Sequence, residues 1–222
     1  MHVADAVATK RTKGGMSDQR RHRLRLEISR EASRLFWNQG VAATRGDQIA
    51  EAVGLSTRTI WRHFRSKESC AEPIVMRGVD PELAILRSWP PELPLEVHFV
   101  VEATKLTQKA TPIDVADNGL AVKMIRLADD EPAIRTAWLM ACDQVEREMV
   151  RIIAQRLKLP VEDIDVHLHA AAASAALRVI NEDVGAKLLE GVDPAQLGDT
   201  AAWIAQAIRR ATGGAVGDPV KR

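Results

Sequence analysis

A three-residue break, Gly54-Leu55-Ser56, separates two short stretches that each carry apolar residues at helical spacing. Glycine readily adopts the left-handed conformation that ends a helix, and serine is a preferred N-cap for the next one. We therefore expect one short helix that ends at Gly54 and another over residues 57–64. Two helices joined by so tight a turn are typical of a helix-turn-helix, and this feature constrains the fold more than any other.

The composition favours helices in the rest of the 222-residue chain. Aromatic residues make up 4% and tyrosine is absent, whereas Ala, Leu, Arg and Glu are abundant. Sheets draw on aromatic and β-branched side chains, while the abundant residues here favour helix. We predict an all-α protein with an N-terminal three-helix helix-turn-helix domain and a C-terminal helical domain.

Caps and glycines predict where the N-terminal helices begin and end. The first helix should start at Ser17 and stop at Gly40, and Thr44 followed by Asp47 predicts a capping box for the second helix. The chain is then expected to divide into four parts, which are a disordered basic arm (1–16), the helix-turn-helix domain (17–67), a helical domain (68–211) and a flexible tail (212–222).

Prolines punctuate the second domain. Pro81 is expected to open a new segment, and the proline-rich residues 89–94 must form a loop. Further helices are expected at 95–110, 113–128, 131–158, 162–190 and 194–211.

The basic residues are concentrated at the N-terminus. Residues 1–67 carry 14 Lys or Arg against 6 Asp or Glu, whereas the remainder carries 17 against 24. Such asymmetry predicts a surface for a polyanion, although a solvated basic face on an ordinary bundle would show the same excess. The caps, the tight turn and the confinement of charge to this third favour double-stranded DNA.

The second helix of a helix-turn-helix enters the major groove of DNA. Ile60 and Phe64 would pack inward, leaving Arg58 suited to a guanine edge and Thr57 to a thymine methyl group. The full set of predicted DNA-binding residues lies on this face or at helix ends near phosphates: Thr44, Arg45, Ser56, Thr57, Arg58, Trp61, Arg62, His63 and Lys67.

The span from Ala32 to Lys67 resembles the N-terminal domain of the tetracycline-repressor (TetR) family. It carries a helix followed by a Gly and a capping Thr. The motif I-A-x-x-V-G-L-S comes next, then an aromatic residue two positions before His-Phe, and finally S-K-E. The family often has Tyr where this chain has Trp61, which lacks the phosphate-reaching hydroxyl. The resemblance implies a transcriptional regulator, acting as a repressor, that binds a palindromic operator as a dimer and is released by a ligand.

By the same resemblance, the second domain would bind a small, mostly apolar or amphipathic ligand. Its apolar stripes could equally be plain core, because every buried helix needs one. The expected lining is apolar with a few polar anchors, namely Trp89, Phe99, Met124, Trp138 and Met140 with Asn118, Arg126 and Gln144.

The resemblance also implies a homodimer through helices 162–190 and 194–211. Their apolar stripes suit close helix contact, but the same stripes could pack against their own domain. The stripes are Leu168, Ala171, Ala172, Ala175 and Val179 on the first helix, and Leu197, Ala201, Ile204 and Ile208 on the second.

Other classes of function find little support. No nucleophile elbow, phosphate loop or paired-acid motif appears, so we expect neither an enzyme nor a cofactor. His167 and His169 lie two apart on a helix and point to different sides, so no metal site is expected. Cys70 and Cys142 suggest reduced cytoplasmic thiols, and no apolar run reaches the roughly 18 residues of a membrane span.

The alternative that stays open is a DNA-binding regulator without small-molecule input, gated by a protein partner or by its concentration.

Overall fold

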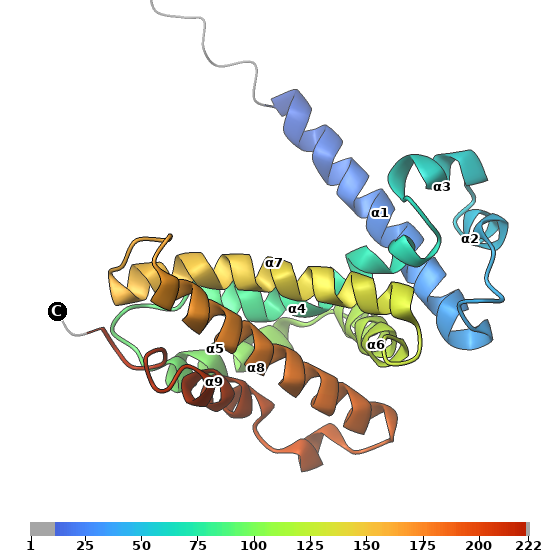
Figure 1. The fold of residues 1–222 in the computed structure, drawn as a ribbon. Helices are drawn as coiled ribbons and strands as arrows, with labels where there is room; N and C mark the ends of the chain where they lie inside the picture. Colours follow the sequence, from blue (N-terminus) through green and yellow to red (C-terminus); the bar gives the residue numbers. More distant parts are fainter. Residues whose placement is uncertain (1–11, 221–222) are drawn as a thin grey trace, which may run out of the picture. The chain divides into compact units, whose positions relative to one another are not determined.

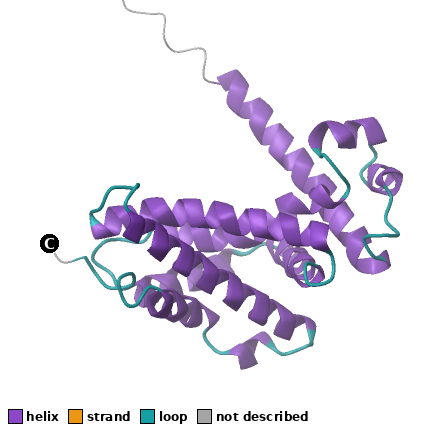
Figure 2. Ribbon diagram, viewed as in Figure 1, coloured by secondary structure: helices purple, strands orange, loops and turns teal. Residues whose placement is uncertain are grey.

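The computed structural model describes residues 12–220, whose regular structure is helical throughout (Figure 2). The predicted all-α fold is confirmed for these residues. The chain separates into two compact units, residues 1–73 and 74–222. The boundary therefore falls inside a helix rather than after residue 67.

Figure 1 labels the helices in chain order. Their bounds are α1 (Thr12–Gln39), α2 (Gly46–Ala52), α3 (Thr57–His63), the 3₁₀ helix η1 (Glu68–Ala71), α4 (Glu72–Arg87), α5 (Leu95–Lys109), α6 (Pro112–Leu127), α7 (Pro132–Leu157), α8 (Ile164–Leu189), the 3₁₀ helix η2 (Pro194–Leu197) and α9 (Thr200–Ala211). The predicted helix over 194–211 is thus two elements, because Asp199 caps a separate α9.

The first unit is built around one face of α1. Ile28, Ala32 and Phe36 follow at four-residue spacing and are fully buried. Gly40 has a φ of +86° and donates its amide N–H to the carbonyl of Phe36, so it ends α1 where the sequence predicts. The helix begins at Thr12, before the predicted start; of the expected disordered arm, residues 1–11 lie outside the described residues.

The second helix begins differently from the prediction. Thr44 is fully buried, and its Oγ1 donates to the carbonyl of Gly40 at 2.8 Å. Arg45 is the N-cap instead, with its amide N–H donating to Oε1 of Gln48 at 2.8 Å. The predicted Thr44–Asp47 capping box is wrong because the threonine hydroxyl turns back to the end of α1.

The second unit is a layered bundle. Helix α8 packs against α6, α7 and α9, and α5 packs against α9. Helix α4 runs through Pro81, so the prediction that this proline opens a new segment is wrong. The proline removes one backbone donor, but it is exposed, and the buried Val79 and Leu83 beside it hold the helix by packing.

The C-terminal residues are tied to the loop between α4 and α5. Leu95 donates its amide N–H to the carbonyl of Gly217, and Val220 donates to that of Pro91, both at 2.8 Å. Val216 is buried. The prediction of a flexible tail from residue 212 is therefore wrong for residues 212–220, because backbone hydrogen bonds and a buried apolar side chain anchor them.

Candidate nucleic-acid interface

Helix α3 is held by its inward face and by its first cap. Ile60 is fully buried and Phe64, at the end of the helix, is 5% exposed. Ser56 Oγ accepts the amide N–H of Thr59 at 3.2 Å, which confirms the predicted N-cap. Because this two-turn helix is fixed at both ends, the side chains on its other face start from a defined position.

The outer face of α3 carries two arginines that the fold does not use. Arg58 and Arg62 are exposed, and neither has a hydrogen-bond or ion-pair partner among the described residues. Thr57 is half-buried at the start of the same helix. Unpaired guanidinium groups in this setting can form bidentate bonds to guanine or to phosphate. The sequence predicts that both arginines face outward, and both are exposed, while their contacts with DNA stay a prediction.

Helix α1 supports the C-terminal end of α3. The Arg25 guanidinium donates to the carbonyl of His63 and lies 4.4 Å from the ring centroid of Phe64. Burial lowers the pKa of His63, and the charges of Arg25, Arg62 and Arg21 lower it further. His63 therefore sits in a cationic environment that an anion would neutralise. Sequence patterns assign no role to Arg25, because His63 lies 38 residues further along the chain.

Trp61 lies over the first residue of α2. A Cβ built on Gly46 would lie 2.8 Å from Cη2 of Trp61 and closer still to Cζ2. The indole ring thus fills the space in which any other residue at position 46 would place its side chain. Trp61 is 43% exposed on the outer face of α3, as predicted, but its ring also lies against α2.

Two predicted phosphate contacts point into the structure. Lys67 Nζ donates to the carbonyls of Val41 at 2.7 Å, Thr44 at 2.8 Å and Ala42 at 3.4 Å. An ammonium has three N–H groups, so these carbonyls occupy all of its donors. Thr44 is 0% exposed and its hydroxyl proton is used within the turn. Neither side chain is directed at a ligand, because both close the turn between α1 and α2.

Arg45 and Ser56 also have partners within the unit. Arg45 donates through Nε and Nη2 to the two carboxylate oxygens of Asp47, each at 3.1 Å. The hydrogen bond from Arg45 is the largest cause that lowers the pKa of Asp47. Such an exposed ion pair is weak and a phosphate could replace it. Ser56 is exposed, but its oxygen is already the cap of α3.

The predicted ligand-lining residues of the second unit do not converge. Phe99, Met124 and Trp138 are at most 1% exposed and form part of the core. Trp138 donates its indole N–H to Glu182 at 2.8 Å. Trp89 is buried with its indole N–H on the carbonyl of Leu93. The indole N–H groups of both tryptophans therefore have their hydrogen-bond acceptors within the fold.

The remaining predicted ligand residues are on the surface. Met140, Asn118 and Gln144 are exposed. Arg126 is exposed too and pairs with Asp129 at 3.0 Å. The helical pattern placed them near the apolar stripe, but each side chain turns to the outer side of its helix.

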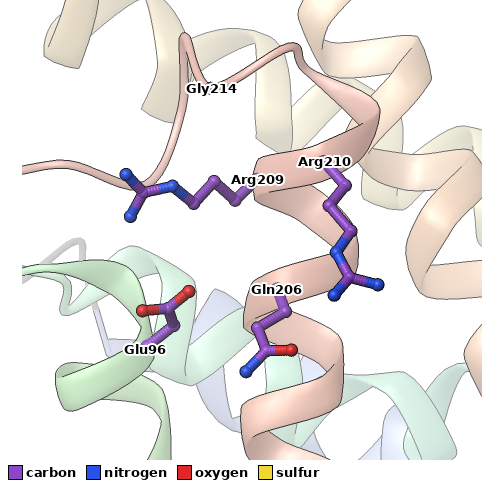
Figure 3. A pocket seen from close by; sticks show the side chains of 5 residues that line it. All are labelled: Glu96, Gln206, Arg209, Arg210 and Gly214. Carbon is purple, nitrogen blue, oxygen red and sulfur yellow. The ribbon is translucent and has the colours of Figure 1, made fainter.

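A polar cleft of about 500 Å³ opens between the start of α5 and the end of α9 (Figure 3). It is lined by Glu96, Gln206, Arg209, Arg210 and Gly214. Arg209 is paired with Asp218 at 2.8 Å. None of the eight predicted ligand residues lines this cleft.

Neither a metal-ligand cluster nor a membrane-spanning helix is found in the described part of the chain. No group of three His, Cys, Asp or Glu there could hold a metal ion. His167 is exposed and His169 half-buried on α8. The helices in the described range include none with the length and apolarity needed to cross a bilayer.

Comparison with known proteins identifies the first unit and then most of the chain. Residues 28–74 match the family model described as bacterial regulatory proteins, tetR family. The chain is 31% identical over 163 residues to the HTH-type transcriptional regulator TcmR of Streptomyces glaucescens, covering 72% of each protein. This chain belongs to the TetR family. It is a TetR-family transcriptional regulator. The members of the family, including the relative named above, are regulators rather than enzymes.

Solved structures show that the TetR-family fold extends over both units. A TetR-family regulator from Rhodococcus sp. has a TM-score of 0.55 at 17% identity, covering 87% of this chain and 99% of its own. Salmonella enterica GusR has a TM-score of 0.53 at 18% identity, covering 86% and 94%. Thermus thermophilus FadR, solved in complex with lauroyl-CoA, has a TM-score of 0.51 at 18% identity with the same coverage. At these identities the likeness concerns the fold alone.

Proposed function

We propose that this TetR-family regulator is a repressor that binds a palindromic operator as a homodimer and leaves it when a small ligand binds. The observation that carries the DNA contact is the pair Arg58 and Arg62, exposed and unpaired on a helix anchored by Ile60 and Phe64. A two-fold dimer would present two copies of α3 to half-sites about 34 Å apart, one turn of B-DNA.

The operator test begins with selection of genomic fragments that the purified protein retains. Arg58→Ala should weaken binding to the selected fragment by roughly 1–3 kcal/mol and relax the preference at one base pair. Arg34→Ala is the matched control, since Arg34 lies in the same unit but pairs with Glu31 on α1. Fragments with no shared palindrome, or equal losses from both variants, would contradict the proposed DNA contact.

The proposed dimer surface is centred on α8. Leu168 and Val179 are 59% and 53% exposed, and Ala175 between them is exposed too, so an apolar stripe lies open. The sequence-predicted stripe on α9 differs, because Ile204 and Ile208 are buried in their own unit. Removal of the open stripe from water would drive association of two copies.

Sedimentation velocity tests this surface. Val179→Glu should convert dimers to monomers at micromolar concentration, because dimerisation would bury an unpaired carboxylate. Val115→Glu is the matched control, since Val115 is an exposed valine on α6. A dimer that survives Val179→Glu unchanged would contradict the assignment to α8.

Ligand release is supported by the fold shared with Thermus thermophilus FadR, which was solved with lauroyl-CoA. We propose a small, mostly apolar ligand for this chain as well. A titration of the operator complex with lipophilic acids and acyl thioesters tests the proposal by gel shift. Ligand-dependent release supports it.

A regulator without small-molecule input is the second candidate. It is favoured by the buried positions of Phe99, Met124 and Trp138, which leave these side chains as ordinary core. An operator complex that responds to none of the tested ligand classes, but follows protein concentration alone, would support this candidate instead.

A further inference from the structure

Gly46 is not required by the backbone at its position. It is the first residue of α2, and its φ is not among the positive values found at glycines such as Gly40 and Gly54. An L-amino acid could therefore adopt the same backbone conformation. The reason for a glycine here must be space rather than torsion.

The space beside Gly46 is taken by the ring of Trp61. The benzo edge of the indole, atoms Cζ2 and Cη2, occupies the position that a Cβ at residue 46 would need. These atoms are the far end of an exposed side chain, so the ring can rotate away at small cost. A side chain at position 46 would displace the ring and leave the backbone of α2 in place.

A displaced ring would move onto the face that carries the proposed DNA contacts. Trp61 lies three residues after Arg58 on α3, so these two side chains are neighbours on the exposed side of the helix, and Arg62, four residues after Arg58, is the other neighbour of Arg58. In its seated position the ring lies against Gly46 of α2. Rotated outward, it would stand between these side chains and the DNA.

We propose that Gly46 is a positioning residue for DNA recognition, which acts by seating the Trp61 ring against α2 and keeping the outer face of α3 open for Arg58 and Arg62. The inference rests on the proposed operator binding. It assigns Gly46 and Trp61 as a matched steric pair: a larger residue at one position requires a smaller one at the other.

A double-mutant cycle tests the pair on the full-length protein. Gly46→Ala should weaken binding to the selected operator about tenfold, with a thermal unfolding midpoint close to that of the wild type. Trp61→Phe removes the benzo edge, so Gly46→Ala should have almost no further effect in that background. Gly119→Ala, at an α6 glycine with nothing within 4 Å of the added Cβ, is the matched control and should bind like wild type.

A second measurement follows the ring itself. The Trp61 indole N–H resonance, assigned by its loss in Trp61→Phe, should shift in Gly46→Ala without DNA present. Equal losses of affinity in both backgrounds, or an unmoved indole resonance, would overturn the inference. Equal losses would indicate that the DNA backbone approaches Gly46 directly. A wild-type protein that selects no DNA sequence would instead overturn the proposed function, while the resonance would still report the steric pair.

Discussion

The ammonium nitrogen of Lys67 lies 2.7 Å from the carbonyl oxygen of Val41, a residue 26 positions earlier in the chain. Further bonds to the carbonyls of Thr44 and Ala42 make Lys67 the tie that closes the turn between α1 and α2. When a buried carbonyl loses its charged donor, the desolvation penalty of the unpaired oxygen exceeds the net free energy that the hydrogen bond contributed.

Lys67→Met keeps the length of the side chain and removes the three donors. We expect the free energy of unfolding of the first unit to fall by about 2–4 kcal/mol, measured by urea titration with circular dichroism. Arg58→Met, which removes an unpaired charge, should leave the same midpoint unchanged. An unchanged midpoint in Lys67→Met, together with weaker and less salt-dependent DNA binding, would return Lys67 to the phosphate role that the sequence suggests.

The lowered pKa of His63 should make the stability of the free protein and its affinity for DNA depend on pH in opposite directions. Its pKa in the folded protein lies below the ordinary 6.5, so the unfolded chain binds the proton more readily. The stability of the free protein should therefore be complete above pH 6.5 and decline as the pH falls through that value. A phosphate near His63 would raise the pKa of its imidazole again. Operator affinity should therefore increase as the pH falls from 8 to 6 at constant salt.

His63→Gln separates these effects from other titrations. The variant should show a flatter affinity profile over the same pH range in fluorescence anisotropy, and a smaller loss of stability below pH 6.5. An affinity profile identical to that of the wild type would mean that no phosphate lies near His63.

Arg156 predicts a large stability effect in the second unit. Its guanidinium stacks 3.1 Å from the ring centroid of Trp89 and donates to the carbonyls of Pro90 at 3.2 Å and Asp218 at 3.0 Å. Burial lowers its pKa to about 10, so the group stays charged at neutral pH. Arg156→Met should lower the free energy of unfolding by about 2–4 kcal/mol, because it removes a stack and a link between α7, the proline loop and the C-terminal residues.

Arg151→Met is the matched control for Arg156→Met. Arg151 is an exposed arginine on the same helix, and its Nη1 lies 3.0 Å from Oε1 of Glu148 in a surface ion pair, so its loss should change stability by less than about 1 kcal/mol. Equal effects of the two variants in a guanidinium titration would contradict the linking role of Arg156.

The two cysteines should be unreactive in the folded protein. Burial raises the pKa of Cys70 and that of Cys142 to about 12, so almost no thiolate is present at pH 8. Iodoacetamide followed by mass spectrometry should find both unmodified after a time in which the guanidinium-unfolded protein is fully labelled. A cysteine in the native protein that reacts as fast as a small thiol would contradict the burial.

Predictions based on neighbouring residues agree best with the structure. The Ser56 cap, the Gly40 stop and the inward Ile60 and Phe64 each depend on residues within about one helical turn. The Thr44 capping box failed although it is also local, because the hydroxyl turns toward the end of α1, where it donates to the carbonyl of Gly40 and accepts from Nε2 of Gln39. Both partners lie within five residues of Thr44, so two local arrangements compete for one hydroxyl and sequence spacing alone does not rank them.

By itself, the sequence determined the helical class, the helix-turn-helix and the face of α3 that carries Arg58 and Arg62, because caps and apolar periodicity act through adjacent turns. Only the tertiary structure decided that Lys67 closes a turn and that Trp61 rests on Gly46. It also decided which apolar stripes are covered, burying Ile204 on α9 and leaving Val179 on α8 open. A periodic pattern states that a helix has an apolar face, but the element that covers this face comes from elsewhere in the chain or from another molecule.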